Sequence, residues 1–364
     1  METALRRAGE LGLRRALVGM EGALSRTFRR EGDPAGAGPP GETLAGAPRS
    51  PEAVASVAGR WSPPEPAGAT VEAAESLAAA GLGVRVCGAF GEDEPAEGMA
   101  SFVEKYEGIA LGPPSFRARV EVSAGEWLDL VPAAPSPDLR PESLLGRLGE
   151  GPFLDLFSRT DLVAWLRFGR LPGLAGLLRL LLERVYPSLG PNEHRTFLFG
   201  WDGFPGGAGG AASRSLLRTL ASFHTYGSVF LETGEDGLAP LARELQVGDP
   251  SEDAPGELAA GLRRELGIDL LLVHGPASHL AAGREETVEL THEGEASIAP
   301  SPLSATASRT GFVVGRLLGL GATESLWLAY AFAGAAAAGK APPGFDEAVG
   351  WLQESGGGAR LHTT

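Results

Sequence analysis

The second half of the chain alternates short apolar runs with helix-length segments, and this alternation limits the folds available to it. Apolar runs of four to seven residues predict buried strands. Strands joined through helices form a mainly parallel sheet, which needs helices on both faces. We therefore predict an α/β protein, with strands at 161–166, 195–200, 228–231 and 268–274 and intervening helices at 174–185, 213–225, 238–245 and 257–265.

The first half of the chain carries strands that do not suit such a sheet. Residues 116–122 and 127–131 alternate apolar and polar side chains around a short turn that contains Gly125, which predicts a β-hairpin. We expect lid strands near 16–30 and 112–135, over the carboxyl edge of the sheet, where ligands of parallel sheets bind. An apolar hairpin face also permits a homodimer through the lid; its residues are Val120, Val122, Leu128 and Leu130.

Composition divides the chain into one large domain with two short ends. Residues 1–15 predict an N-terminal helix, residues 16–353 the α/β domain with its lid, and residues 354–364 a tail. Residues 31–66 are rich in Gly, Pro, Ala and Ser, a composition that buries little apolar surface. We expect a low-complexity loop there, and the sequence leaves open whether it is ordered.

Charge and hydrophobicity exclude several classes of partner. The net charge of −15 argues against binding to nucleic acid or to an anionic membrane. No run of apolar residues is long enough to predict a membrane span. The N-terminal arginines are not followed by the apolar run of a secretory signal, so the expected location is the cytoplasm. The single cysteine, Cys87, has apolar neighbours and is expected to be a buried, inert thiol.

Three patterns bear on phosphate or metal binding. Residues 334–341 approach the GxxxxGK[ST] phosphate loop, but an alanine run continues a helix there and Ala341 lacks the magnesium-binding hydroxyl, so we reject this interpretation. Residues 203–210 are glycine-rich and follow a strand; they either cradle phosphate through backbone N–H groups or form a flexible connector. The histidines lack metal-binding spacings, so no metal site is predicted.

Residues 304–311 are the segment most suggestive of anion binding. Their small side chains predict a turn that leads into an apolar helix at 312–320, and a second helix follows at 324–338. A turn at a helix N-terminus presents free backbone N–H groups and the positive end of the helix dipole. We therefore expect this turn to be a place where a phosphate could be held.

Taken in order, these features resemble the ribokinase-like (PfkB-type) carbohydrate kinases over most of residues 16–353. The segment Val18-Gly-Met-Glu-Gly-Ala-Leu24 is similar to the opening strand and turn of that family, and residues 68–93 to its sugar-binding segment. Further matches follow in the family's order at 161–172, 197–204, 229–237 and 303–315. The resemblance implies a three-layer sandwich with a mainly parallel central sheet and a small β lid. It also implies a nucleotide-binding transferase that moves phosphate from ATP or ADP, with Mg, to a sugar hydroxyl.

The reaction centre of that family is altered in this sequence. The catalytic aspartate aligns with Thr310, whose hydroxyl cannot act as a base near neutral pH without an activator. The glycine-lined anion hole aligns with Ala307, Ser308 and Arg309, whose side chains can close the approach that glycines leave open. The Arg309 guanidinium could instead hold an anion.

The remaining functional positions of the family are altered too. The family's NxxE motif, which organises magnesium and phosphate, aligns with Gly234–Gly237 and loses both polar residues, although Glu232, Glu235 and Asp236 lie close by. The acid after the central strand is shifted to Asp202. The resemblance places sugar binding at Glu21, Ser25, Gly68 and Ala69.

Losses at the sugar, metal, anion and base positions occur together, while the apolar framework is kept. This combination predicts a pseudokinase, a homologue without phosphoryl transfer that acts as a binding or regulatory protein. The alternative is an active divergent kinase in which Asp202, Glu232 or Glu235 replaces the lost acids. A different doubly wound α/β protein is the third interpretation. The sequence names neither the sugar or nucleotide ligand nor a protein partner.

Overall fold

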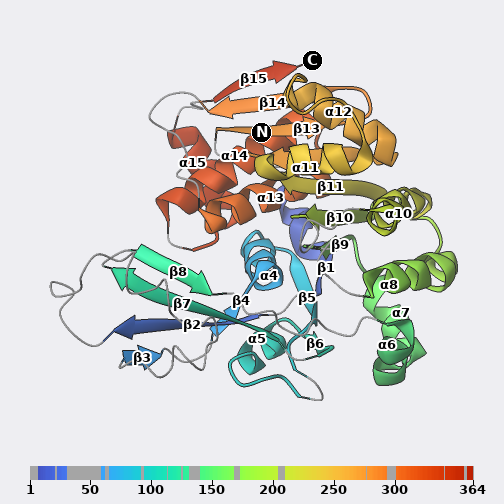
Figure 1. Cartoon of the computed structure of the whole chain (residues 1–364), viewed down its shortest axis with the longest axis vertical. Helices are drawn as coiled ribbons and strands as arrows, with labels where there is room; N and C mark the ends of the chain where they lie inside the picture. The colour runs from blue at the N-terminus through green and yellow to red at the C-terminus, as the bar shows by residue number, and fades with distance from the viewer. Residues whose placement is uncertain are drawn as a thin grey trace. The chain divides into compact units, whose positions relative to one another are not determined.

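A ten-stranded sheet organises the protein in the computed structural model (Figure 1). The structure describes residues 7–20, 23–30, 59–61, 65–91, 94–112, 114–123, 126–130, 140–167, 173–203, 210–275, 277–292, 301–339, 341–355 and 359–363. The sheet order is β15 (Ala359–Thr363), β14 (Thr287–His292), β13 (Ser278–Ala282), β12 (Leu270–His274), β11 (Ser228–Gly234), β10 (Thr196–Trp201), β9 (Leu162–Trp165), β1 (Arg15–Met20), β5 (Gly83–Gly88) and β6 (Ile109–Ala110).

The centre of this sheet is parallel, as the alternating pattern predicts. Strands β1, β9, β10, β11 and β12 pair in parallel, whereas β13, β14 and β15 continue the sheet in antiparallel fashion. Every residue of β9 and β10 is buried. Helices α12 and α14 both pack on β13 and β14, which requires opposite faces of the sheet (Figure 1). The result is a three-layer α/β sandwich, and the predicted fold class is confirmed.

A smaller five-stranded sheet contains the predicted hairpin. Its order is β3 (Gly59–Trp61), β2 (Ala23–Arg30), β7 (Ser115–Ser123) and β8 (Glu126–Leu130), and β4 (Glu65–Ala67) also pairs with β2. Strands β7 and β8 are antiparallel, which confirms the hairpin. The side chains on which the expected dimerisation rests lie outside the described part of the chain, so dimerisation stays a prediction.

The helices complete the layers of the sandwich. The helices that precede β9 in the described chain are α4 (Ala69–Ala79), α5 (Ala100–Lys105), α6 (Pro141–Leu148) and α7 (Glu150–Ser158). Those after β9 are α8 (Leu174–Leu180), α9 (Tyr186–Leu189), α10 (Ala211–Thr219), α11 (Glu235–Leu245), α12 (Pro255–Leu266), α13 (Pro302–Leu317), α14 (Ala322–Ala338) and α15 (Phe345–Glu354). The described residues also form the 3-10 helices η1 (Ala8–Leu13) and η6 (Leu220–Thr225) and the π-helical segment η4 (Leu181–Val185).

The chain divides into two compact units. One comprises residues 1–19, 72–85 and 139–364, and the other residues 20–71 and 86–138. The first unit contains the parallel strands from β9 to β12 and all helices from α6 onward. The second contains the five-stranded sheet. No helix within the described ranges is long and apolar enough to span a membrane.

Three expectations, about the lid, the C-terminal tail and the N-terminal helix, need correction. Strand β1 was expected in the lid but lies in the main sheet, paired with β9, because its buried apolar residues need cover on both faces. The expected tail at 354–364 contains β15, which pairs with β14 at the sheet edge. The described part of the expected N-terminal helix is the short 3-10 helix η1, since Gly9 and Gly12 weaken a longer helix. Most of the expected loop at 31–66 lies outside the described residues. Its described part contains β3 at 59–61 and the start of β4 at 65.

Candidate functional site

The carboxyl ends of the parallel strands gather polar side chains at one edge of the sheet. Glu232 lies near the end of β11 opposite Gly200 of β10, and His274 ends β12 opposite Gly234. Asp202 follows β10 directly. Because parallel strands end at the same edge, this edge is where a ligand of the fold would bind.

Helix α13 brings Arg309 onto this edge, where it forms a two-point ion pair with Glu232. The Arg309 Nε donates to Glu232 Oε2 at 2.5 Å, and its Nη2 donates to Oε1 at 2.7 Å. The side chains are 18% and 5% exposed, respectively, so the pair is largely removed from water. Two parallel hydrogen bonds between planar ionic groups are a strong and geometrically specific contact.

The charges of this pair stabilise each other. Burial by itself would raise the pKa of Glu232, but Arg309 and the nearby His274 outweigh it and lower the pKa to about 2. Burial opposes the charge of Arg309 as well, yet Glu232, with Glu72 and Asp202 further off, holds the pKa of Arg309 above its ordinary value. Both groups are therefore ionised at neutral pH.

Two histidines and a serine extend the network behind the ion pair. The His274 Nε2 lies 3.4 Å from Glu232 Oε1, and the Ser308 Oγ lies 3.4 Å from the His274 Nδ1. The same Ser308 oxygen is 3.4 Å from both ring nitrogens of His279. Ser308 is fully buried, so its hydroxyl serves these internal contacts and is not exposed to a substrate.

The turn predicted at 304–311 is wrong, because these residues belong to the interior of α13. The helix begins at Pro302, and its cap is Ser301, whose Oγ accepts from the Ser304 N–H at 3.0 Å. An N-cap serine followed by proline is a strong start signal, and the helix begins at Pro302, about three turns earlier than expected. The helix predicted at 312–320 overlaps the end of this helix at 312–317 and runs past its C-cap at Leu318, and the one at 324–338 is confirmed as α14.

This shift changes what residues 307–310 can do. In an α-helix the N–H group of each interior residue bonds to the carbonyl four residues earlier. The N–H groups of Ala307, Ser308 and Arg309 are thus committed to the helix, whereas an anion hole needs them free. Thr310, at the aligned position of the catalytic base, is 2% exposed.

Asp202 takes part in a second ion pair on the same edge. The Arg167 Nε lies 3.4 Å from Asp202 Oδ2, and both side chains are partly exposed. Arg167 has a φ of 54°, in the left-handed region that residues with a Cβ rarely adopt. This backbone turn follows β9 at the end of the strand, next to the edge where Asp202 lies.

The other predicted positions lie on α11 or in the second unit. Gly234 caps α11 and Glu235 is exposed in its first turn, where an acidic side chain interacts favourably with the helix dipole. Of the sugar positions, Ser25 lies in β2, Gly68 follows β4 and Ala69 begins α4, all in the second unit; Glu21 lies outside the described residues. Glu72 lies on α4 in the first unit and accepts a 3.4 Å hydrogen bond from the Thr306 hydroxyl.

Sequence reasoning missed His274, His279, Glu72 and Arg167. His274 was expected only as the last residue of a strand, and nothing in its neighbourhood indicates a contact with α13. Position at the carboxyl end of a parallel strand is the one signal that singles it out. Across the described ranges no three His, Cys, Asp or Glu side chains group closely enough to hold a metal ion.

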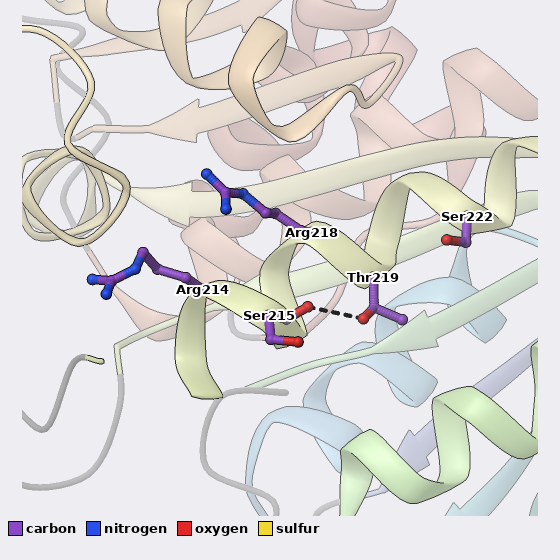
Figure 2. Close-up of a pocket in the computed structure, with 5 residues that line it drawn as sticks. All are labelled: Arg214, Ser215, Arg218, Thr219 and Ser222. Carbon is purple, nitrogen blue, oxygen red and sulfur yellow. Dashed lines mark hydrogen bonds between the residues drawn. The ribbon is translucent and has the colours of Figure 1, made fainter. Parts of the chain in front are cut away.

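A separate polar hollow lies on α10 and η6. Figure 2 shows Arg214 and Arg218 extending from α10, with Ser215 and Thr219 joined by a 2.8 Å hydrogen bond from the Thr219 hydroxyl to the Ser215 carbonyl. Arg218 pairs with Glu265 at 2.6 Å, and Arg214 lies 3.9 Å from Glu244. Both arginines are thus already matched by acids of the neighbouring helices, and we assign no function to this surface.

The sheet order and the helical layers match the ribokinase-like fold of solved carbohydrate kinases. Solved structures with this fold match nearly the whole chain. A carbohydrate kinase from Agrobacterium tumefaciens is 15% identical with a TM-score of 0.63, and the match covers 96% of this chain and 100% of that one. An Arabidopsis thaliana ribokinase in complex with ribose and ATP is 14% identical with a TM-score of 0.62, covering 93% and 98%.

A third similar structure is a fructokinase with bound ATP from Xylella fastidiosa, which is 14% identical with a TM-score of 0.60. The match covers 94% of this chain and 99% of the fructokinase chain. No protein-family model matches the sequence, and no curated protein does. At these identities the likeness shows the fold, and the expected resemblance is confirmed at that level.

Proposed function

We propose that this protein is a sugar-kinase homologue that no longer transfers phosphate and acts as a binding or regulatory protein. The observation that carries the proposal is the continuous helix α13, which uses the N–H groups of residues 307–309 internally and places Arg309 on Glu232. The charge of the Glu232 carboxylate is therefore neutralised by Arg309. A buried threonine stands where a general base, worth about 10²–10⁴ in rate, is expected.

The other carboxylates offer no ready replacement for that base. Asp202 is paired with Arg167, and Glu235 is exposed at the start of α11. A catalytic base must reach the hydroxyl that it deprotonates, and its charge must be available for that proton. The arrangement therefore favours a pseudokinase over the divergent active kinase, and any sugar or nucleotide would be held as a ligand.

The direct test is an assay of the purified chain with Mg²⁺, ATP or ADP, and a panel of pentoses and hexoses. We expect no consumption of nucleotide that depends on the sugar, because Thr310 replaces the base, α13 uses the N–H groups of residues 307–309, and Glu232 and Asp202 are paired with arginines. The variant Asp202→Ala serves as the control for contaminating kinases. Sugar-dependent turnover in the wild type that disappears in Asp202→Ala would establish the active kinase instead.

Restoring the family's aspartate is expected to fail. In Thr310→Asp the new carboxylate would lie at a position that is 2% exposed, within a helix that leaves no anion hole beside it. We expect no sugar-dependent turnover and a loss of stability of at least about 1–3 kcal/mol, because a buried acid without partners is costly. Denaturant unfolding and the kinase assay measure the two effects.

The matched control is Thr310→Val, which keeps the shape of the side chain without adding a charge. It should remain closer in stability to the wild type than Thr310→Asp. A gain of sugar-dependent turnover in Thr310→Asp would mean that the rest of a reaction centre is intact, and the proposal would then be wrong.

A further inference from the structure

We propose that a hollow between α12 and the β13–β14 turn binds a sugar monophosphate. Its volume is about 500 Å³, within the range of small-molecule sites. The turn lies where β12 begins, because Ala282 pairs with Leu271, whereas Glu232 and His274 lie where the strands end. The hollow is therefore at the opposite edge of the sheet from the kinase-like site.

Three arginine side chains from two elements line the hollow. Arg263 and Arg264 come from the last turn of α12, and Arg284 comes from the β13–β14 turn. No ion pair involving Arg264 occurs among the described residues, so its guanidinium is available to a ligand. The Arg263 Nε is buried and has no hydrogen-bond partner in the part of the chain that the structure describes. Buried donors of this kind are normally satisfied by protein, water or a ligand.

The third arginine is held in place by the protein. Arg284 Nη2 lies 2.8 Å from Asp269 Oδ1. Asp269 is fixed in turn, since its Oδ2 accepts from the Val229 N–H at 2.8 Å and lies 2.8 Å from the His224 Nδ1. A cation held in this way loses little freedom when an anion arrives, which favours binding.

The arginines also repel one another. Burial lowers the pKa of Arg263, and the charges of Arg264 and Arg284 lower it further, with only Asp269 acting in the opposite direction. A phosphate placed among them would relieve this repulsion and could accept two-point hydrogen bonds from the guanidinium groups.

Acidic side chains on the rim of the hollow narrow the choice of ligand. Glu257, Glu285 and Glu286 line it and form no ion pairs within the described chain. Ionised carboxylates only accept hydrogen bonds, so they suit the hydroxyl groups of a sugar and repel a polyanion. No aromatic side chain appears among the described residues that line it, which leaves no surface for stacking a nucleobase. A sugar monophosphate has a phosphate that the arginines can bind and hydroxyl groups that can donate to the glutamates.

Calorimetric titration of the full chain with ribose 5-phosphate and glucose 6-phosphate tests the proposal. We expect at least one to bind, with ribose, glucose and inorganic phosphate each binding more weakly. Arg264→Ala should weaken binding about 10-fold or more, because a hydrogen bond to a charged group is lost. Arg264 is exposed, so the substitution should leave folding intact.

Two further variants separate the roles of the groups. Arg179→Ala removes an exposed arginine of α8 that has no ion pair in the described chain, and it should leave binding unchanged. Glu257→Gln should weaken binding of the sugar phosphates relative to inorganic phosphate, since it replaces a charged hydroxyl acceptor by a weaker amide acceptor, whereas the loss of the repulsive charge favours both ligands.

Failure of both sugar phosphates to bind, or binding that Arg264→Ala leaves unchanged, would overturn the proposal. Inorganic phosphate binding as tightly as the sugar phosphates would overturn the assignment of a sugar ligand. These results are independent of the turnover assay, which concerns the other edge of the sheet.

Discussion

Arg309→Ala is expected to lower the free energy of unfolding by about 3–5 kcal/mol, the cost of leaving one member of a buried ion pair without its partner. Glu232 is 5% exposed and receives both hydrogen bonds from this guanidinium. Among the described residues, His274 is the other group that contacts this carboxylate, with its Nε2 at 3.4 Å from Oε1. Urea unfolding of the two proteins near neutral pH measures the difference.

The pH dependence of this effect follows from the pKa of Glu232. The wild-type value is lowered from 4.5 to about 2, so the pair contributes stability that is fully present above pH 4.5 and lost as the pH falls toward 2. In Arg309→Ala the burial remains and its main opposing charge is gone, so the pKa of Glu232 should rise. The destabilisation should therefore be largest near neutral pH and shrink as the pH is lowered, in the range where both proteins stay folded.

Two controls distinguish the ion pair from a general loss of charge or packing. Arg179→Ala removes an exposed arginine of α8 and should change stability by no more than about 0.5 kcal/mol. The double variant Arg309→Met with Glu232→Leu replaces both charges by apolar groups and should recover most of the loss. A destabilisation by Arg309→Ala that is the same at every pH would contradict the role assigned to Glu232.

The parallel sheet could be predicted because each of its central strands is a short apolar run that can be recognised from neighbouring residues alone. The runs that form β10 and β12 are apolar except for Thr196 at the start of β10 and His274 at the end of β12, and a strand buried on both faces needs such a composition. The hairpin of β7 and β8 was predictable for the complementary reason, a strict alternation around a glycine-containing turn. Strand β1 was misplaced because a short apolar run does not reveal which of two sheets it joins.

The candidate site was less predictable, because it depends on where one helix begins. Small residues at 304–311 suit a turn, but Ser301 and Pro302 upstream start the helix earlier, and this sets the orientation of Arg309. Its pairing with Glu232 joins residues 77 positions apart. The sequence marked both residues as candidates through the resemblance, but their mutual neutralisation emerges only from the packing of α13 against the sheet.

Gly311→Ala is expected to destabilise the protein by about 1–3 kcal/mol, because it separates α13 from α14. A Cβ at Gly311 would lie well inside the 3.0 Å limit that real Cβ atoms keep, against the backbone carbonyl of Leu328 on α14. A backbone carbonyl cannot swing aside as a flexible side chain can. Gly315, one turn further on, approaches Ser325 in the same way, so the two helices meet along a seam of small residues.

Gly350→Ala is the matched control, since Gly350 lies within α15 and its added Cβ would meet nothing within 4 Å. There the better helix propensity of alanine should raise stability by about 0.5–1 kcal/mol. The two identical substitutions should therefore shift the urea midpoint in opposite directions. Equal stabilisation by both would show that α13 and α14 can move apart at little cost. Arg309 lies two residues before Gly311 on the same helix, so close packing of α13 on α14 also supports the position of its guanidinium against Glu232.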